Sequence, residues 1–168
     1  MSEVKGLKKL NKAISKELAT FGIAKAECTG EYSYVFADET VTFKLTEGTI
    51  EDDLFDEFVR DRFGYNIPSS FVFSLLHEVG HHKANDNIID DVYSFCLAEK
   101  ERIEKEMEFA ETIEEVKKLE FQYFNLPDEI MATQWAVKYS VQHPQEVEKM
   151  WVECEKALHK FYRKNEVQ

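Results

Sequence analysis

The sequence predicts an α+β fold in which a helix and a small antiparallel sheet precede a predominantly helical C-terminal half. Short segments rich in aromatic and β-branched residues are confined to residues 21–46, whereas apolar residues recur at helical spacing on both sides of them. Gly (6) and Pro (3) are scarce among the 168 residues, which favours long helices. A chain of this length is expected to form one domain, 1–168, with a buried core.

The N-terminal region is predicted to contain a helix and then strands. An amphipathic helix is expected within the first twenty residues, because four apolar residues recur there at helical spacing: Leu7, Leu10, Ile14 and Leu18. Two or three strands are expected in the segments 21–28, 31–37 and 40–46. In the last segment Val41 and Phe43 alternate with polar residues, which predicts one buried and one solvated face.

From residue 49 onward the pattern is helical. The first apolar stripe ends at Gly64, and Ser69 marks the start of a helix whose first seven residues are almost uncharged and should be buried. Residues 84–126 are interpreted as an acidic helical insertion, a hairpin in which Thr112 and Glu115 are spaced as a capping box. The last two helices are expected near 127–142 and 144–163, each starting at a proline.

Composition excludes several classes of protein. The formal net charge of -12, from 33 acidic and 21 basic residues, disfavours nucleic acid as a direct partner and favours a basic partner segment. The three cysteines are far apart and form no C-x-x-C pair, which is typical of reduced thiols in the cytoplasm. The N-terminus has no apolar signal region, and no apolar run is long enough to span a membrane. We therefore expect a cytoplasmic protein.

The chemically informative motif is His77-Glu78-Val79-Gly80-His81, an H-E-x-x-H pattern on a predicted helix. Four residues make slightly more than one helical turn, so the two imidazoles project from the same face and can bind one metal ion. Glu78 is rotated by about 100° from His77 and can instead act on a water molecule. This division of roles is that of a zinc peptidase, in which the carboxylate is the general base and then the general acid.

A third ligand has to come from elsewhere in the chain. His82 points away from the pair, His143 is expected to cap the last helix, and His159 lies in its exposed final turn. Glu129 is the best remaining candidate, since it begins an apolar helix in which the small Ala132 permits close approach to the H-E-x-x-H helix.

The two pieces FSLLHEVGHH (73–82) and EIMATQWA (129–136) together resemble the ImmA/IrrE family of zinc metallopeptidases. The resemblance implies His77, His81 and Glu129 as Zn²⁺ ligands and Glu78 as the catalytic acid and base. It also implies a zincin-like fold, with a small sheet beside the active-site helix and an edge strand that aligns a peptide substrate. Members of the family are intracellular, are often carried by phages and other mobile elements, and several cleave a repressor-type regulator.

Two features of the predicted site are specific to this sequence. Thr133 stands where family members often have Asp or Asn, and an uncharged partner for a ligand predicts a lower metal affinity. A hydrogen-bond donor for the developing oxyanion could come from Tyr123, Tyr139 or His143, and the sequence does not choose among them.

The sequence is also compatible with three functions other than that of an ImmA/IrrE-type peptidase. The chain could be a catalytically inactive zincin scaffold that binds or assembles with a partner. It could belong to another group of zinc peptidases, such as the SprT-like proteins, with His143 or His159 as the third ligand. It could also be a helical protein that binds no metal.

Overall fold

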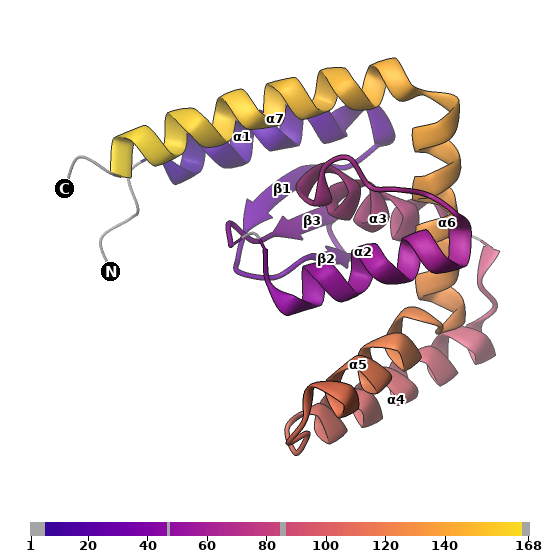
Figure 1. Ribbon diagram of the computed structural model, residues 1–168. Coiled ribbons are helices and arrows are strands. Elements are labelled where there is room, and N and C mark those ends of the chain that lie inside the picture. Colours follow the sequence, from indigo (N-terminus) through magenta and orange to yellow (C-terminus); the bar gives the residue numbers. More distant parts are fainter. Residues whose placement is uncertain (1–5, 47, 85–86, 166–168) are drawn as a thin grey trace.

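The computed structural model describes residues 6–46, 48–84 and 87–165, and it confirms the α+β class. A helix and a small three-stranded sheet precede a mostly helical C-terminal half (Figure 1). In chain order the elements are α1 (Leu7–Leu18), the short 3-10 helix η1 (Ala19–Phe21), β1 (Lys25–Cys28), β2 (Ser33–Val35), β3 (Thr40–Phe43), α2 (Ile50–Phe63), α3 (Ser70–Ala84), α4 (Asp90–Met107), α5 (Ile113–Phe124), α6 (Pro127–Gln142) and α7 (Pro144–Asn165).

The sheet is mixed, so the prediction of an antiparallel sheet was wrong. Its strand order is β1-β3-β2, in which β3 is antiparallel to β2 but parallel to β1. The connection after β1 crosses to the far side of β3, and the turn that follows β2 then brings β3 back between the two outer strands. Both β1 and β2 are therefore edge strands, and each is short, which limits uncontrolled pairing with other chains.

The central strand β3 is buried on both faces, contrary to the predicted solvated face. Thr42 is 7% exposed, and its hydroxyl lies 2.7 Å from Ser33 Oγ and donates to the Glu31 carbonyl oxygen at 3.0 Å. Lys44, just beyond the strand, is 8% exposed, and its Nζ lies 2.9 Å from Asp52 Oδ1. Thr42 and Lys44 are thus buried with partners, as burial requires, whereas the buried Thr40 hydroxyl on the same face has no hydrogen-bond partner among the described residues.

The helix α3 runs through the middle of the molecule, and every residue from Phe71 to Gly80 is buried. Its start matches the prediction, because Ser69 Oγ accepts a hydrogen bond from the Val72 backbone amide at 3.4 Å. The helix α6 packs closely against it. A Cβ atom on Gly80 would lie 2.3 Å from the Ala132 carbonyl oxygen, so this crossing requires glycine.

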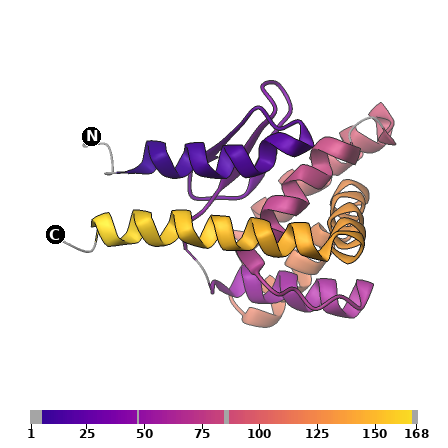
Figure 2. The same cartoon turned by 90° about the horizontal axis from the view of Figure 1, so that it is seen from above.

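The first and last helices close the other side of the core. Figure 2 shows α1 and α7 side by side, running in opposite directions. The apolar stripe predicted for α1 is buried, with Leu10, Ile14 and Leu18 each at most 2% exposed. The helix α7 contributes the buried residues Met150, Cys154, Leu158 and Phe161.

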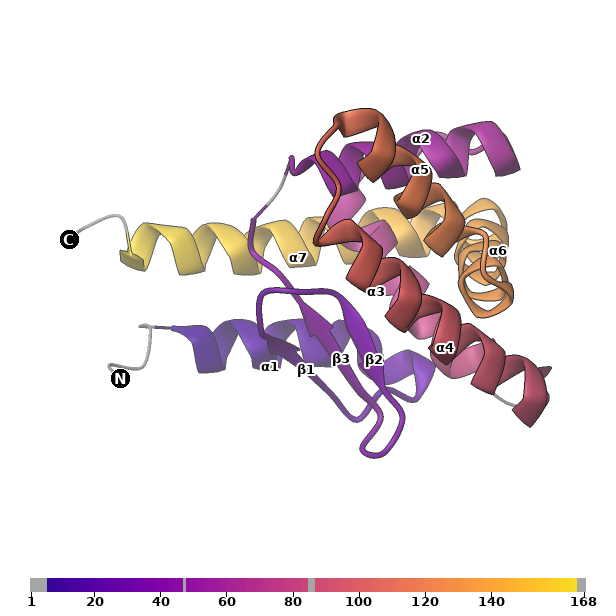
Figure 3. The same cartoon turned by 90° about the horizontal axis from the view of Figure 1, so that it is seen from below.

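The helices α4 and α5 form the predicted acidic hairpin, and both sides of the predicted capping box between them are present. The hairpin residues Cys96, Ile103 and Leu119 form a small apolar cluster with Leu126, which directly precedes α6. It is also attached to the main body, where the Phe121 and Phe124 rings of α5 contact Phe58 of α2. The start of α4 also reaches the residue that follows β2, because the Phe36 and Tyr93 rings are 5.8 Å apart; Figure 3 shows both elements from below.

Two further predictions concern the chain as a whole. Cys28, Cys96 and Cys154 are all free thiols, as expected. Within the described residues, no helix is both long enough and apolar enough to cross a bilayer.

Candidate metal centre

The imidazoles of His77 and His81 lie on one face of α3, as the four-residue spacing predicts. Their Nε2 atoms are 3.2 Å apart and their rings are perpendicular. His77 is buried and the His81 side chain is 12% exposed, so the pair lies at the inner wall of a cavity.

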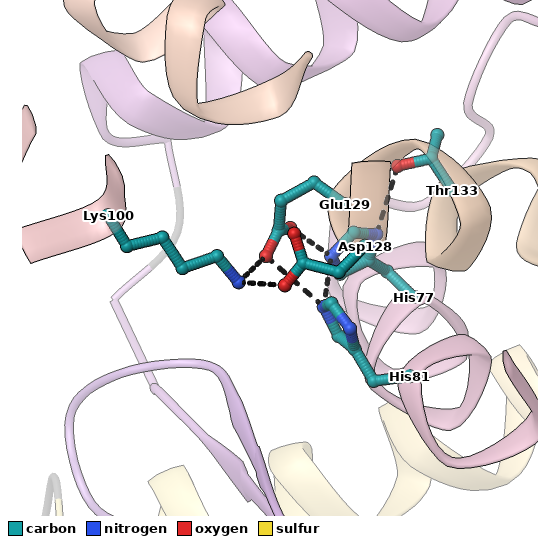
Figure 4. Close-up of polar contacts among 6 residues, drawn as sticks. All are labelled: His77, His81, Lys100, Asp128, Glu129 and Thr133. Carbon is teal, nitrogen blue, oxygen red and sulfur yellow. Dashed lines mark hydrogen bonds and ion pairs between the residues drawn. The ribbon is translucent and has the colours of Figure 1, made fainter. Parts of the chain in front are cut away.

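Glu129 reaches this pair from the first turn of α6 (Figure 4). Its Oε2 lies 2.9 Å from His77 Nε2, and its Oε1 lies 3.4 Å from His81 Nε2. The buried residues of α6 recur every three or four positions and face α3, which places Glu129 over the histidines. Burial raises the pKa of Glu129, but His81 and His77 outweigh it and hold the pKa well below its ordinary value.

The separations of these donor atoms fit one metal ion. Ligands held tetrahedrally at ~2.1 Å from zinc lie about 3.4 Å from one another, close to the distances measured here. His77 Nδ1 lies 3.1 Å from the hydroxyl of the fully buried Thr133. A hydrogen bond at Nδ1 holds the ring in place and leaves Nε2 to face the other donors, which is the usual arrangement of a metal-binding histidine. The buried cluster of His77, Glu78 and His81 with Glu129 could therefore hold a metal.

Glu78 lies beside the cluster and is 6% exposed. One of its carboxylate oxygens is within 4.8 Å of ring nitrogens of both His77 and His81. Burial raises the pKa of Glu78 to about 7, with a smaller opposing effect of His77. A carboxylate in this position and with this pKa can accept a proton and return it at neutral pH.

Two charged residues of the centre were not predicted from the sequence. Lys100, from α4, reaches into the cluster and forms ion pairs with Glu129 and with its neighbour Asp128 (Figure 4). Burial lowers the pKa of Lys100, but the two carboxylates outweigh it, so the ammonium group stays charged. Asp128 is 3% exposed and also lies within 4.8 Å of His81 and Glu129. Nothing in the sequence separates Lys100 from the other lysines of a charged helix.

The remaining histidines lie outside the cluster. His82 Nδ1 is 2.6 Å from the Tyr34 hydroxyl, His143 stacks on Tyr139, and His159 is exposed. Among the described residues, neither group of close metal-binding side chains includes His143 or His159.

The metal centre opens into a cavity of about 450 Å³. Its walls come from β2, from α2, α3 and α6, and from the α4–α5 hairpin. Of the three candidate oxyanion donors, Tyr123 lines this cavity. Tyr139 and His143 do not line it, and Tyr139 instead stacks on Trp135 and contacts Phe21.

Comparison of the chain with models of known protein families, with curated proteins and with solved structures finds no match.

Proposed function

We propose that the protein is a zinc-dependent metalloendopeptidase that hydrolyses peptide bonds in a protein substrate. The observation that supports it best is the convergence of His77, His81 and Glu129 within 3.4 Å of one another, with Glu78 beside them in a cavity open to a substrate. The proposal follows the division of roles in H-E-x-x-H peptidases, in which three side chains hold the metal and a fourth moves the proton.

His77, His81 and Glu129 would hold the zinc ion, which when bound supplies a Lewis acid that activates water and polarises the peptide carbonyl. Thr133 would orient His77 through Nδ1. Glu78 would accept the proton of the attacking water and deliver it to the amine that leaves. The pKa of about 7 suits both steps, because neither protonation state of Glu78 is strongly favoured at neutral pH.

Tyr123 and Lys100 are two donors that could serve a developing oxyanion. Both line the cavity, and Lys100 Nζ lies 5.2 Å from the centre of the Tyr123 ring. Lys100 already bonds to Glu129 and Asp128, so we assign it to positioning the Glu129 carboxylate. The Tyr123 hydroxyl is then the preferred oxyanion donor.

The edge strand β2 gives the substrate a place to bind. Ser33 and Tyr34 of this strand line the cavity, and an extended peptide could pair with its free edge. This arrangement supports the zincin-like description of the fold. Following the resemblance to ImmA/IrrE peptidases, we propose a repressor-type regulator as the substrate, in a cytoplasmic protein of phage or mobile-element origin.

One observation favours a second function. The ammonium group of Lys100 already supplies a positive charge to Glu129 and Asp128, so the cluster is held together without a metal. Under this alternative the chain is an inactive zincin scaffold that binds or assembles with a partner and cleaves nothing.

A pair of variants separates these functions. The zinc-loaded protein is incubated with a peptide library from a cell digest, and cleavage products are identified by mass spectrometry. We expect Glu78→Gln to keep its zinc and to lose roughly 10²–10⁴-fold in cleavage rate. Glu129→Ala should lose the zinc, measured by elemental analysis. Glu155→Gln, an exposed change on α7, should match the wild type in both measurements.

The proposal would be wrong if the Glu78→Gln and wild-type proteins gave the same products at the same rate. A wild-type chain that binds zinc but cuts no peptide would favour the inactive scaffold. A chain that holds less than about half a zinc ion after loading would exclude the metal centre.

A further inference from the structure

The cavity that contains the metal centre has two chemically different ends. Where β2 ends, the lining is mostly aromatic and apolar, with Tyr34, Phe36, Tyr93 and Leu97. Where β2 begins, the lining is charged, with Glu31, Lys44, Glu51, Asp52 and Glu120, which we call the acidic corner. Four carboxylates face a single lysine there.

We propose that the acidic corner binds a lysine or arginine side chain of the substrate, next to the bond that is cut. The inference rests on the proposed peptidase function and specifies the class of peptide that the enzyme selects.

The one cation of the corner is already neutralised. Lys44 Nζ lies 2.9 Å from Asp52 Oδ1 and 3.7 Å from Glu51 Oε2, and it donates a hydrogen bond to Thr49 Oγ1 at 3.1 Å. Lys44 and Asp52 are both shielded from water, so they form a closed pair. The corner therefore keeps an excess of negative charge that Lys44 does not balance.

Glu120 is the buried carboxylate of the corner, and it has no partner among the described residues. It is 9% exposed and lines the cavity, yet no described residue lies within ion-pair distance of it or forms a hydrogen bond with it. Burial and the charge of Glu51 together raise the pKa of Glu120 to about 7, although Lys44 opposes them. A buried carboxylate that lacks a partner is costly, and an entering ammonium or guanidinium group would supply one.

A metal ion fits the acidic corner less well than a lysine or arginine side chain does. In the described part of the chain, no three of the corner carboxylates have donor atoms that all lie within 4.8 Å of one another. A divalent ion needs such closely spaced oxygens. A charged group on a long flexible arm can instead pair with Glu120 and Glu51 from between them.

The corner is also close enough to the metal centre for one substrate to occupy both. Glu120 lies on α5 about one helical turn before Phe124. The Phe124 ring is 5.1 Å from the Phe55 ring, which is 5.2 Å from the His77 ring. An extended peptide advances about 3.3 Å per residue, so a side chain one or two residues from the cleaved bond would reach the corner.

The test uses the zinc-loaded full chain and pairs of peptides that differ only in lysine or norleucine near the cleavage site. We expect the wild type to prefer lysine by roughly 10- to 100-fold in kcat/KM. Glu120→Gln should bring this preference close to one through slower cleavage of the lysine peptide, while zinc content stays unchanged. Glu114→Gln, the same change on the exposed side of α5, should keep the preference.

A binding measurement separates this inference from the peptidase function. Agmatine, which has a guanidinium group on a short arm, is titrated into the wild-type, Glu120→Gln and Glu114→Gln proteins and followed by NMR. Binding that Glu120→Gln abolishes would support the corner even if no peptide were cleaved. Cleavage without a preference for lysine would contradict the proposed role of the acidic corner, and so would agmatine binding that is equal in all three proteins. Neither result would contradict the peptidase proposal.

Discussion

At the scale of single residues, the hydroxyl of Thr133 is the contact on which the orientation of His77 depends. It lies 3.1 Å from His77 Nδ1 in a fully buried position. We expect Thr133→Val, which keeps the shape and removes the hydrogen bond, to weaken zinc binding by about 10- to 100-fold. Competition against a chelator of known affinity would measure this. Thr133→Ser, which keeps the hydroxyl, should lose much less zinc affinity. Equal losses of affinity in both variants would contradict the role of the hydrogen bond.

Glu120 predicts a pH dependence of stability. Its pKa is about 7 in the folded protein, against an ordinary value of 4.5, so the folded state binds more protons between these pH values. The unfolding free energy of the wild type should therefore fall as the pH rises from about 4.5 through 7. In Glu120→Gln the contribution of Glu120 to this fall should be absent. Because solvent reaches Glu120 through the cavity, we expect a gain of about 1–2 kcal/mol in the unfolding free energy at pH 8.

Urea unfolding of the wild type and Glu120→Gln at pH 5 and pH 8 measures the effect as a difference between the two proteins. The variant should be the more stable one at pH 8, with a smaller gap at pH 5. Equal gaps at both pH values would show that Glu120 is not the group that titrates, even though Glu51 and Lys44 act on it.

At this scale, the sequence predicted correctly which side chains come together where local spacing decides it, and their chemical roles stay a prediction. His77 and His81 share a helix face because four residues make about one turn, and Glu129 was identified by the apolar helix that follows it. Lys100 and Glu120 could not be found in this way. Their special surroundings come from packing between distant segments, which no sequence pattern in a charged helix reveals.

At the scale of elements, the contact between α3 and α6 depends on Gly80. A side chain there would collide with the backbone of Ala132, not with a movable side chain. Glycine to alanine in a helix usually stabilises by about 1 kcal/mol. We expect the opposite sign for Gly80→Ala, a loss of about 1–3 kcal/mol with weaker zinc binding, because the helices that hold the ligands must separate.

Thermal and urea unfolding, with and without zinc, would measure this loss. Lys83→Ala, on the exposed side of the same helix, should change the unfolding free energy by less than about 0.5 kcal/mol. A stabilised Gly80→Ala protein would contradict the close packing of α3 on α6.

Helices were predicted better than the sheet for a physical reason. The start of a helix is set by a few adjacent residues, and the box of Thr112 and Glu115 is present as predicted. The order of the strands depends instead on how distant parts of the chain pack against each strand. The strand β3 lies between β1 and β2 and is buried on both faces. Its alternating apolar and polar residues predicted the buried face correctly, but they did not reveal that the polar face is buried as well.

At the scale of the whole molecule, a metal ion would join elements that are distant in the chain. His77 and Glu129 are on different helices, so a site that exists only in the folded state links zinc binding to stability. At a free zinc concentration of 100 times Kd, we expect a gain of about 2.7 kcal/mol, or an increase in Tm of roughly 5–10 °C. Differential scanning calorimetry of the wild type and Glu129→Ala would measure it, and the variant should not respond.

The pairing of α1 with α7 has a consequence for how the protein is made. The two helices are separated by most of the chain, yet they lie side by side. During translation, the apolar face of α1 that contacts α7 has to wait until the last helix leaves the ribosome. Nascent chains that stall before then would expose this face, which makes them the natural targets of chaperones and of quality-control proteases.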